Sequence, residues 1–382
     1  MSDAMNKHDR AFVRTEHLPQ SPPPVSTSGV IGWARENLFS SPLNAVLTIA
    51  SFYFLYLVVP PFVQWAFIDA AWWGSSNKDC AGYDGACWAV VTARFGQFVY
   101  GFYPEAERWR PNLVLVLFAI NLLPVLWDRV PGRTVAALFL VTGFPLIALF
   151  FIHGGLGLEV VPTPKLGGFM LNLIMAAVAI IYSLPLGILL ALGRRSEFRI
   201  ISRFCVLFIE FWRGVPLITV LVMASFMLPF FMPDGFNFNE LLRALVGLTL
   251  FSSAYMAEVV RGGLRALPKG QTEAARAMGL TYWQSIRLII MPQALKITIP
   301  AIVNTFIGLF KDTSLVIVIG LFDLLQVAKS SVTDTNWLGL EHETYVFVAL
   351  VFFYRLLRDV SVQPLPRTKT RYRSQKLSGE IS

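Results

Sequence analysis

Charged residues are scarce in this chain of 382 residues. Asp, Glu, Lys and Arg make up only 15% of it, whereas 55% of its residues are hydrophobic. A typical soluble domain carries about 25% charged residues, so this composition excludes an ordinary soluble protein and a disordered chain. It predicts an all-α membrane protein that crosses the bilayer several times, because each helical crossing needs about 20 apolar residues in a row.

The sequence also lacks the residue patterns of catalytic and nucleotide-binding sites. No Gly is followed by Lys, which excludes the Walker A loop that cradles nucleotide phosphates. No nucleophile elbow, zincin motif or pair of catalytic carboxylates is present. The histidines are scattered without metal-ligand spacing: His8, His17, His153 and His342. We therefore expect no enzyme activity, no cofactor and no metal site on this chain.

Long apolar runs are what the sequence has instead, and they predict about eight transmembrane helices. Three lie before residue 167 and five after it. The last run contains Arg355, Arg358 and Asp359, whose charges are expensive at mid-bilayer. The predicted helices are residues 43–68, 109–127, 134–152, 167–192, 204–232, 241–257, 299–322 and 345–362.

Lysine and arginine are distributed unevenly between the connecting segments. If the N-terminus is cytoplasmic, the inner segments hold 22 of these residues and the outer loops hold 7. Cytoplasmic loops of membrane proteins are enriched in Lys and Arg. The count therefore predicts a multi-pass protein of a bacterial inner membrane with its N-terminus inside the cell. The net charge of +8 then reflects topology and requires no nucleic-acid partner.

The chain has only three cysteines. Cys80 and Cys87 lie in the predicted outer loop, where an oxidising periplasm allows a disulfide. Two free thiols in a mobile loop are the alternative. Cys205 lies in an apolar run, where we expect it to serve only for packing.

A polar, basic and glycine-punctuated segment, residues 258–296, separates two of the apolar runs. Within it, Glu273-Ala274-Ala275 is followed after three residues by Gly279, and after nine more by Ile289-Ile290-Met291-Pro292. This spacing resembles the EAA loop of ABC importer permeases, from whose usual form only Met291 departs. Neighbouring motifs resemble the polar amino-acid importers of that family: Tyr255-Met256-Ala257-Glu258, Arg261-Gly262-Gly263, Pro268-Lys269-Gly270-Gln271 and Lys311-Asp312-Thr313-Ser314-Leu315.

The resemblance implies an architecture and a set of domains. Residues 167–362 would form the five-helix core of a type I ABC importer permease, with the cytoplasmic EAA loop at residues 258–296. Residues 43–166 would be a three-helix membrane extension with a periplasmic loop, 69–108, as in the M-type permease of general L-amino-acid transport systems. The ends of the chain are expected to be a disordered cytoplasmic tail, residues 1–42, and a basic cytoplasmic tail, residues 363–382.

The resemblance also implies a function and partners. The chain would be the membrane subunit of an ATP-driven importer of polar L-amino acids, with broad specificity, that a periplasmic binding protein delivers. Its partners would be a homologous permease in a heterodimer, a dimer of ATP-binding subunits that carries ATP and Mg, the substrate and the lipid bilayer. The alternative is an ion-coupled secondary amino-acid transporter, whose broken helices in inverted repeats do not explain the EAA spacing.

The residues of the EAA loop also predict its local structure without reference to the family. Pro268 and Gly270 end the preceding helix, Thr272 is placed to cap a short alanine-rich helix, and Gly279 ends that helix. Its alanines leave one face flat for docking, while its arginine can bond a partner's carboxylates. In the family this segment receives the movement of the ATPase, which assigns coupling to Glu273, Ala274, Ala275, Arg276, Gly279 and Pro292. The alternative is an ordinary solvated amphipathic helix.

A second polar group lies inside the seventh apolar run, where ionised side chains by default indicate a pathway or binding site. On a helix, Asn304, Gly308, Lys311 and Ser314 form a stripe on one side, with Asp312 about 100° around. Lys and Asp complement the two charges of a zwitterionic amino acid. The substrate pathway is therefore predicted at Asn304, Lys311, Asp312 and Ser314. The alternative is an internal salt bridge between Lys311 and Asp312 that only holds helices together.

A third group is assigned a structural role. Glu210 and Arg213 are three residues apart and are expected to neutralise each other, as are Glu258 and Arg261. Pro216 belongs to a motif similar to the Glu/Arg-Gly-x-Pro element that opens a core helix in the family. We expect it to break the helix.

Overall fold

The computed structural model describes residues 29–126, 132–233 and 238–361, and side chains only as far as residue 353. These residues are helical almost throughout and contain isolated bridges but no β-strand, which confirms the all-α prediction. The chain divides into two compact units, Met1–Ala70 and Ala71–Ser382. Residues 1–28 of the predicted disordered tail and all of the predicted basic tail lie outside the described residues.

The first unit consists of a short helix and one long apolar helix. α1 (Gly29–Asn37) falls within the tail that we expected to be disordered. α2 (Pro42–Val63) continues as a π-helical turn, Gln64–Ile68. The hydroxyl of Ser41 accepts a hydrogen bond from the amide of Asn44 at 3.2 Å, which caps the start of α2. This helix is apolar on all sides, as expected of a helix surrounded by lipid.

The described residues contain five helical segments that are long and apolar enough to cross a membrane: Pro42–Ile68, Arg133–His153, Gly168–Arg194, Glu240–Ala266 and Tyr282–Ile319. A sixth crossing is formed if α8 (Arg199–Gly214) and the segment Leu217–Phe231 count as one, although they are bent by 102°. The predicted runs 109–127 and 345–362 are also helices, α5 (Trp109–Leu126) and α15 (Glu341–Ser361), but are not among these crossings. The multi-pass architecture is confirmed, whereas the count of eight is not.

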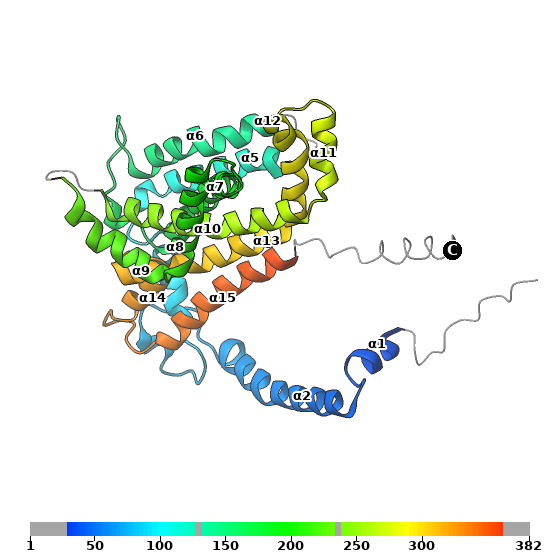
Figure 1. The fold of residues 1–382 in the computed structure, drawn as a ribbon. Helices are drawn as coiled ribbons and strands as arrows, with labels where there is room; N and C mark the ends of the chain where they lie inside the picture. The colour runs from blue at the N-terminus through cyan, green and yellow to red at the C-terminus, as the bar shows by residue number, and fades with distance from the viewer. Residues whose placement is uncertain (1–28, 127–131, 234–237, 362–382) are drawn as a thin grey trace, which may run out of the picture. The chain divides into compact units, whose positions relative to one another are not determined.

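In the second unit, α5 and α6 (Arg133–His153) lie side by side and pack on the core (Figure 1). The hydroxyl of Tyr182, on α7 (Gly168–Arg194), donates to the carbonyl of Val141 on α6 at 3.0 Å. Apolar side chains from α5, α6 and α7 also share one buried cluster. These two N-terminal helices are therefore joined to the core by packing as well as by the chain.

Residues 71–108, which we expected to be part of an outer loop, fold into a small cap that includes α3 (Ala89–Ala93) and α4 (Phe95–Tyr100). This outer cap packs on α14 (Leu324–Ser331) and α15. The contacts are an ion pair of Arg94 with Asp334, a 2.7 Å hydrogen bond from the Asn77 amide to the Asn336 carbonyl, and a ring contact of Phe98 with Phe347.

The centre of the core is the pair of helices α7 and α10 (Glu240–Ala266), with α13 (Met291–Asp312) lying along α10 (Figure 1). Gly187 on α7 permits close approach, because a Cβ atom there would lie 2.7 Å from Cβ of Met256 on α10. A buried apolar cluster from α7, α10 and α13 extends to the end of the core where residues 258–296 lie. Those residues are therefore fixed to a packed scaffold.

Candidate functional site

The segment predicted as a cytoplasmic loop, residues 258–296, is mostly helical. α10 continues to Ala266 rather than ending at residue 257. α11 (Lys269–Ala277) and α12 (Tyr282–Ser285) follow, and they lie together at one end of the helical bundle (Figure 1). We call α11, α12 and the turn between them the EAA segment.

The EAA segment begins at Pro268, whose extended backbone occupies the N-cap position of α11. Proline has no amide hydrogen to continue α10, and its fixed φ suits the start of a new helix. The amide of Gln271 donates back to the Pro268 carbonyl at 3.1 Å. The assignment of Thr272 as the N-cap is therefore wrong, since Thr272 lies inside α11.

Gly279 ends α11 in the left-handed conformation, with φ of +74°. The amide of Leu280 donates to the carbonyl of Ala275 at 3.1 Å, and the amide of Gly279 donates to that of Arg276 at 2.9 Å. These are the two hydrogen bonds of a Schellman cap, which requires a left-handed residue at this position. A Cβ atom on Gly279 would meet nothing within 4 Å. Backbone conformation, rather than lack of space, therefore calls for glycine.

The surface of the EAA segment is formed by Glu273, Ala274 and Arg276, which are exposed together with Gly279. Ala275 is fully buried within its own chain. We expected both alanines to face a partner, so this expectation is corrected for Ala275. A helix as short as α11 is not stable alone and must bury one face against its neighbours.

The EAA segment continues directly into the core. Pro292 is exposed at the second position of α13, and the whole run Tyr282–Ile319 is one continuous helical segment. The Gln293 side-chain amide donates to Gln271 of α11 at 3.4 Å. The EAA segment is therefore connected to α13 both by the chain and by a side-chain hydrogen bond.

Close contact couples α13 in turn to α10. A Cβ atom at Gly263 would lie 2.6 Å from the carbonyl oxygen of Ala294 and 2.6 Å from Cγ2 of Thr298. The two backbones can approach this closely only because residue 263 has no side chain. The hydroxyl of Thr298 also donates to the Ala294 carbonyl at 3.0 Å.

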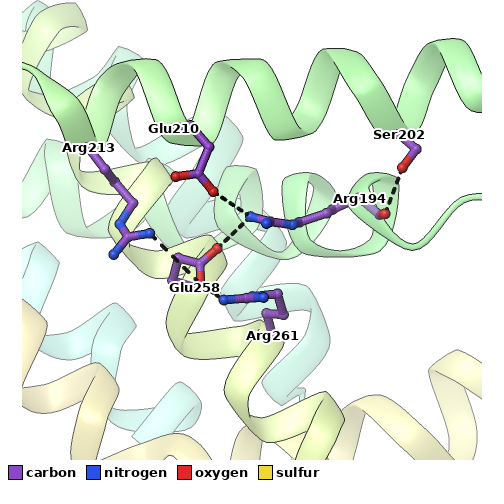
Figure 2. Close-up of polar contacts among 6 residues, drawn as sticks. All are labelled: Arg194, Ser202, Glu210, Arg213, Glu258 and Arg261. Atoms are coloured by element: carbon purple, nitrogen blue, oxygen red, sulfur yellow. Dashed lines mark hydrogen bonds and ion pairs between the residues drawn. The ribbon is translucent and has the colours of Figure 1, made fainter.

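Five charged side chains from three helices meet beside this part of the core (Figure 2). Glu258 of α10 accepts a hydrogen bond from Arg194 of α7 at 2.8 Å and pairs with Arg261. Arg213 of α8 lies 4.0 Å from Glu258, and Arg194 also binds Glu210 at 3.2 Å. We call these residues the Glu258 cluster. It ties α7, α8 and α10 together just before the EAA segment.

The structure pairs Glu258 with Arg261 but does not pair Glu210 with Arg213, which corrects the sequence prediction. α8 packs on α7 and α10, so residues on neighbouring helices lie closer than the residue one turn away. The Arg213 guanidinium also lies over the ring of Tyr255, 5.7 Å from its centroid. The sequence analysis did not include Arg194 among the site residues. Its position at the end of an apolar run was the sequence feature that could have indicated it.

The predicted crossing at residues 204–232 is broken. α8 ends at Gly214, and α9 (Leu217–Val222) begins after two extended residues, Val215 and Pro216. Proline restricts the residue before it to extended conformations and cannot donate to a helical hydrogen bond. Both effects act at this site and account for the bend of 102°.

The predicted polar stripe lies on α13, except for Ser314, which follows it in a 3-10 segment. Asn304 and Lys311 are exposed, and a Cβ atom at Gly308 would meet nothing within 4 Å. The Ser314 hydroxyl donates to the Lys311 carbonyl at 2.8 Å. Asp312 is half-buried, and the described residues give neither it nor Lys311 an ion pair. Within the residues that the structure describes, Asn304 and Lys311 therefore remain open at the surface.

The stripe lies at the end of its helix rather than in the middle of the predicted run 299–322. α13 begins at Met291, because Pro292 is accommodated in its first turn, and it ends at Asp312. A tighter 3-10 segment, Thr313–Ile319, follows. Lys311 is thus about 28 Å along the helix axis from Pro292, at a rise of about 1.5 Å per residue.

A buried polar network that the sequence analysis missed holds the opposite end of α7. The side-chain amide of Asn172 donates to the Thr313 hydroxyl at 2.9 Å, and its oxygen accepts from the Leu324 amide at 3.0 Å. The Asp323 carboxylate caps α14 by accepting from the Gln326 amide at 2.9 Å. Burial raises the pKa of the Asp323 carboxyl above its ordinary value. An asparagine inside an apolar run was the signal for this network.

Cys80 and Cys87 form a disulfide within the outer cap, with Cα atoms 5.8 Å apart. Cys205 is a buried free thiol. In the part of the chain that the structure describes, no cluster of three or more His, Cys, Asp or Glu residues is placed to hold a metal ion.

A multi-pass helical chain with an EAA segment at one end of its core has the architecture of the membrane subunit of an ABC importer. Residues 183–358 match the family described as "Binding-protein-dependent transport system inner membrane component". The chain is 51% identical over 338 residues to the inner membrane amino-acid ABC transporter permease protein YhdY of Escherichia coli (strain K12), covering 88% of this chain and 91% of that protein. This chain belongs to the family of amino-acid ABC transporter permeases.

Other relatives differ in how much of the chain they match. The glutamate/glutamine/aspartate/asparagine transport system permease protein BztC of Rhodobacter capsulatus is 42% identical over 411 residues, covering 90% of this chain and 94% of that protein. The glutamate/aspartate import permease protein GltK of Escherichia coli O157:H7 is 32% identical over 193 residues, covering 49% of this chain and 85% of that protein. The similarity to YhdY and BztC therefore includes much of the chain that precedes the five-helix core.

A solved structure, described as a crystal structure of an amino acid ABC transporter with histidines, is 31% identical with a TM-score of 0.46, covering 51% of this chain and 88% of that one. Family membership makes the chain a transport component of an inner membrane. It gives no support to the ion-coupled alternative.

Proposed function

We propose that this permease conducts polar L-amino acids into the cell as one half of a membrane pathway formed with a homologous permease. A periplasmic binding protein delivers the substrate, and ATP is hydrolysed with Mg on a dimer of separate ATP-binding subunits. The substrate class is supported by the relatives, of which BztC is named for glutamate, glutamine, aspartate and asparagine. The coverage of the N-terminal helices supports assignment to the M-type permeases of general L-amino-acid transport systems.

The observation that carries this proposal is the continuous helical run Tyr282–Ile319. Its first residues belong to the EAA segment, and its last third carries Lys311. A continuous helical run can pass a displacement along its axis, so a push on α11, which contacts α12, would reach the polar stripe. Glu273, Ala274, Arg276 and Gly279 would contact the ATPase, with Ala275 and Pro292 holding that surface in place.

The open polar stripe supports a second permease. An ammonium group that faces lipid costs several kcal/mol, so Lys311 must face water or protein. The part of this chain that the structure describes does not cover it. A facing subunit would enclose a water-filled path, in which Asn304, Lys311, Asp312 and Ser314 form one wall. The N-terminus and the EAA segment would then be cytoplasmic and the outer cap periplasmic.

The proposal is tested by assembling the complete transporter. A tagged chain, co-expressed with the second permease, the ATP-binding subunit and the binding protein, should retain all membrane and ATPase subunits on purification. In liposomes, uptake of labelled glutamate or glutamine should require ATP and be blocked by vanadate. Uptake that follows a proton gradient without ATP would overturn the proposal.

Variants then separate coupling from conduction. Gly279→Asp should uncouple ATP hydrolysis from uptake, and normal coupled uptake would refute the role of the EAA segment. Lys311→Gln should weaken uptake by about 10-fold or more, as loss of a hydrogen bond to a charged group does. Lys296→Gln is the matched control, because Lys296 is also exposed on α13 but lies near the EAA segment. Equal effects of the two substitutions would contradict a substrate role for Lys311.

A further inference from the structure

α8 is an amphipathic helix with one face that the described part of the chain does not cover. Its inner face is buried against α7, where a Cβ atom at Gly193 would lie 2.5 Å from the sulfur of Cys205. Its outer face carries apolar residues at intervals of three and four, which places them in one stripe. This α8 stripe consists of Ile200, Phe204, Leu207 and Phe211, which are 85%, 64%, 71% and 55% exposed.

Basic side chains border the α8 stripe on one edge. Around the helix axis, Arg203 lies about 40° and Arg199 about 80° from Leu207, the nearest member of the stripe, and Arg195 lies in the turn that precedes α8. All three are exposed, and the described residues provide no ion pair for any of them. Glu197 is the acidic residue of this turn, so residues 195–203 carry a net charge of +2. Arg194, by contrast, is held by the Glu258 cluster.

The bend after α8 separates this helix from the membrane crossing. α8 is inclined by 102° to Leu217–Phe231, so it does not continue in the direction of that segment. A helix with an apolar stripe and a basic edge lies in the plane of the membrane interface, with its apolar residues among the acyl chains. Basic residues at the cytoplasmic surface are attracted by anionic phospholipids.

We propose that α8 binds anionic phospholipids of the cytoplasmic leaflet. The α8 stripe enters the acyl region, and Arg195, Arg199 and Arg203 bind the lipid phosphates. This inference goes beyond the transport function and rests only on the cytoplasmic placement of the turn between α7 and α8. Because Glu210 and Arg213 lie on the same helix, bound lipid also steadies the helix that contributes them to the Glu258 cluster.

A spin label identifies what covers the α8 stripe. Leu207→Cys is labelled in a Cys205→Ala background, in the assembled transporter in nanodiscs of phosphatidylcholine and phosphatidylglycerol. Contact with acyl chains gives high collision rates with oxygen and low rates with a water-soluble nickel chelate. A label protected from both reagents is covered by the second permease, and one open to nickel faces water. Either result overturns the proposal. Glu197→Cys, in the turn between α7 and α8, is the water-exposed control.

Charge dependence is tested with a triple variant. Replacing Arg195, Arg199 and Arg203 by Gln should reduce phosphatidylglycerol retained on the purified transporter, measured by native mass spectrometry, by at least about 10-fold. Retained phosphatidylcholine should not change, and a triple Lys variant should restore binding if charge is what matters. The matched control removes the same charge from the C-terminal segment with Lys369→Gln, Arg371→Gln and Arg373→Gln. The proposed lipid site is refuted if both triple Gln variants lose the same amount of phosphatidylglycerol. It is also refuted if the variant of Arg195, Arg199 and Arg203 retains as much as the unmodified protein.

Discussion

The contact between α10 and α13 allows a quantitative prediction with an internal control. In Gly263→Ala the new methyl group would lie 2.6 Å from the Ala294 carbonyl oxygen and 2.6 Å from Cγ2 of Thr298. Both helices must therefore separate, because a backbone carbonyl cannot rotate away as a flexible side chain can. In Gly262→Ala the methyl group would meet nothing within 4 Å.

The magnitude follows from the difference between the two variants. Each replaces glycine by alanine in the same turn of α10, so the gain in helix propensity, about 1 kcal/mol, is common to both. Overpacking costs about 1–3 kcal/mol and applies only to Gly263→Ala. We therefore expect Gly263→Ala to be less stable than Gly262→Ala by about 1–3 kcal/mol, which corresponds to a few degrees in Tm.

The assay is thermal unfolding of the purified transporter, followed by ATP-driven uptake in liposomes. Separation of α13 from α10 also displaces the EAA segment, so Gly263→Ala should lower the ratio of substrate transported to ATP hydrolysed. Gly262→Ala should keep the ratio of the unmodified protein. If both variants unfold at the same temperature and transport equally, the close approach of these helices does not exist.

Two further predictions concern Gly279 and the Glu258 cluster. Gly279→Asn should retain more uptake than Gly279→Val, because a β-branched residue is strongly disfavoured in the left-handed conformation that asparagine tolerates; equal uptake rates would contradict the Schellman cap. Glu258→Gln should reduce the free energy of unfolding by about 2–4 kcal/mol, since it leaves arginines from three helices without their shared carboxylate. Glu210→Gln should cost less than about 1 kcal/mol, because Glu210 is 55% exposed and binds one arginine. Denaturant unfolding compares the two, and similar losses would show that Glu258 is not the centre of the cluster.

Rules that relate short sequence patterns to backbone structure correctly predicted the short helix of the EAA segment and where it ends. The spacing from Glu273 to Pro292 predicted a short helix that ends at Gly279, and the φ of that residue agrees with the reason for placing glycine there. The predicted start of the helix at Thr272 is wrong, because the helix begins after Pro268, four residues earlier. Proline determines the backbone on its own, whereas a threonine cap depends on where the helix begins.

Contacts between helices were not accessible from the sequence. The spacing of Glu210 and Arg213 is favourable for a pair on one helix, but spacing says nothing of a neighbouring helix that presents Arg194 and Glu258. The burial of Ala275 follows from how α11 packs, which composition does not reveal. Asn172 and Thr313 are 141 residues apart in the chain and meet only because α7 packs against the 3-10 segment that follows α13.

The break at Val215–Pro216 and the Glu258 cluster together restrict where the core can bend. Every residue of the cluster lies on α7, α10 or the part of α8 that precedes the break. A change in the angle between α8 and α9 therefore leaves all its ion pairs intact, whereas a shift of α8 relative to α7 or α10 must break at least one. The two extended residues donate no intrahelical hydrogen bond that such a change would cost. Movement that enters through the EAA segment should thus displace α13 and α10 together, and α9 can follow by rotation about this break.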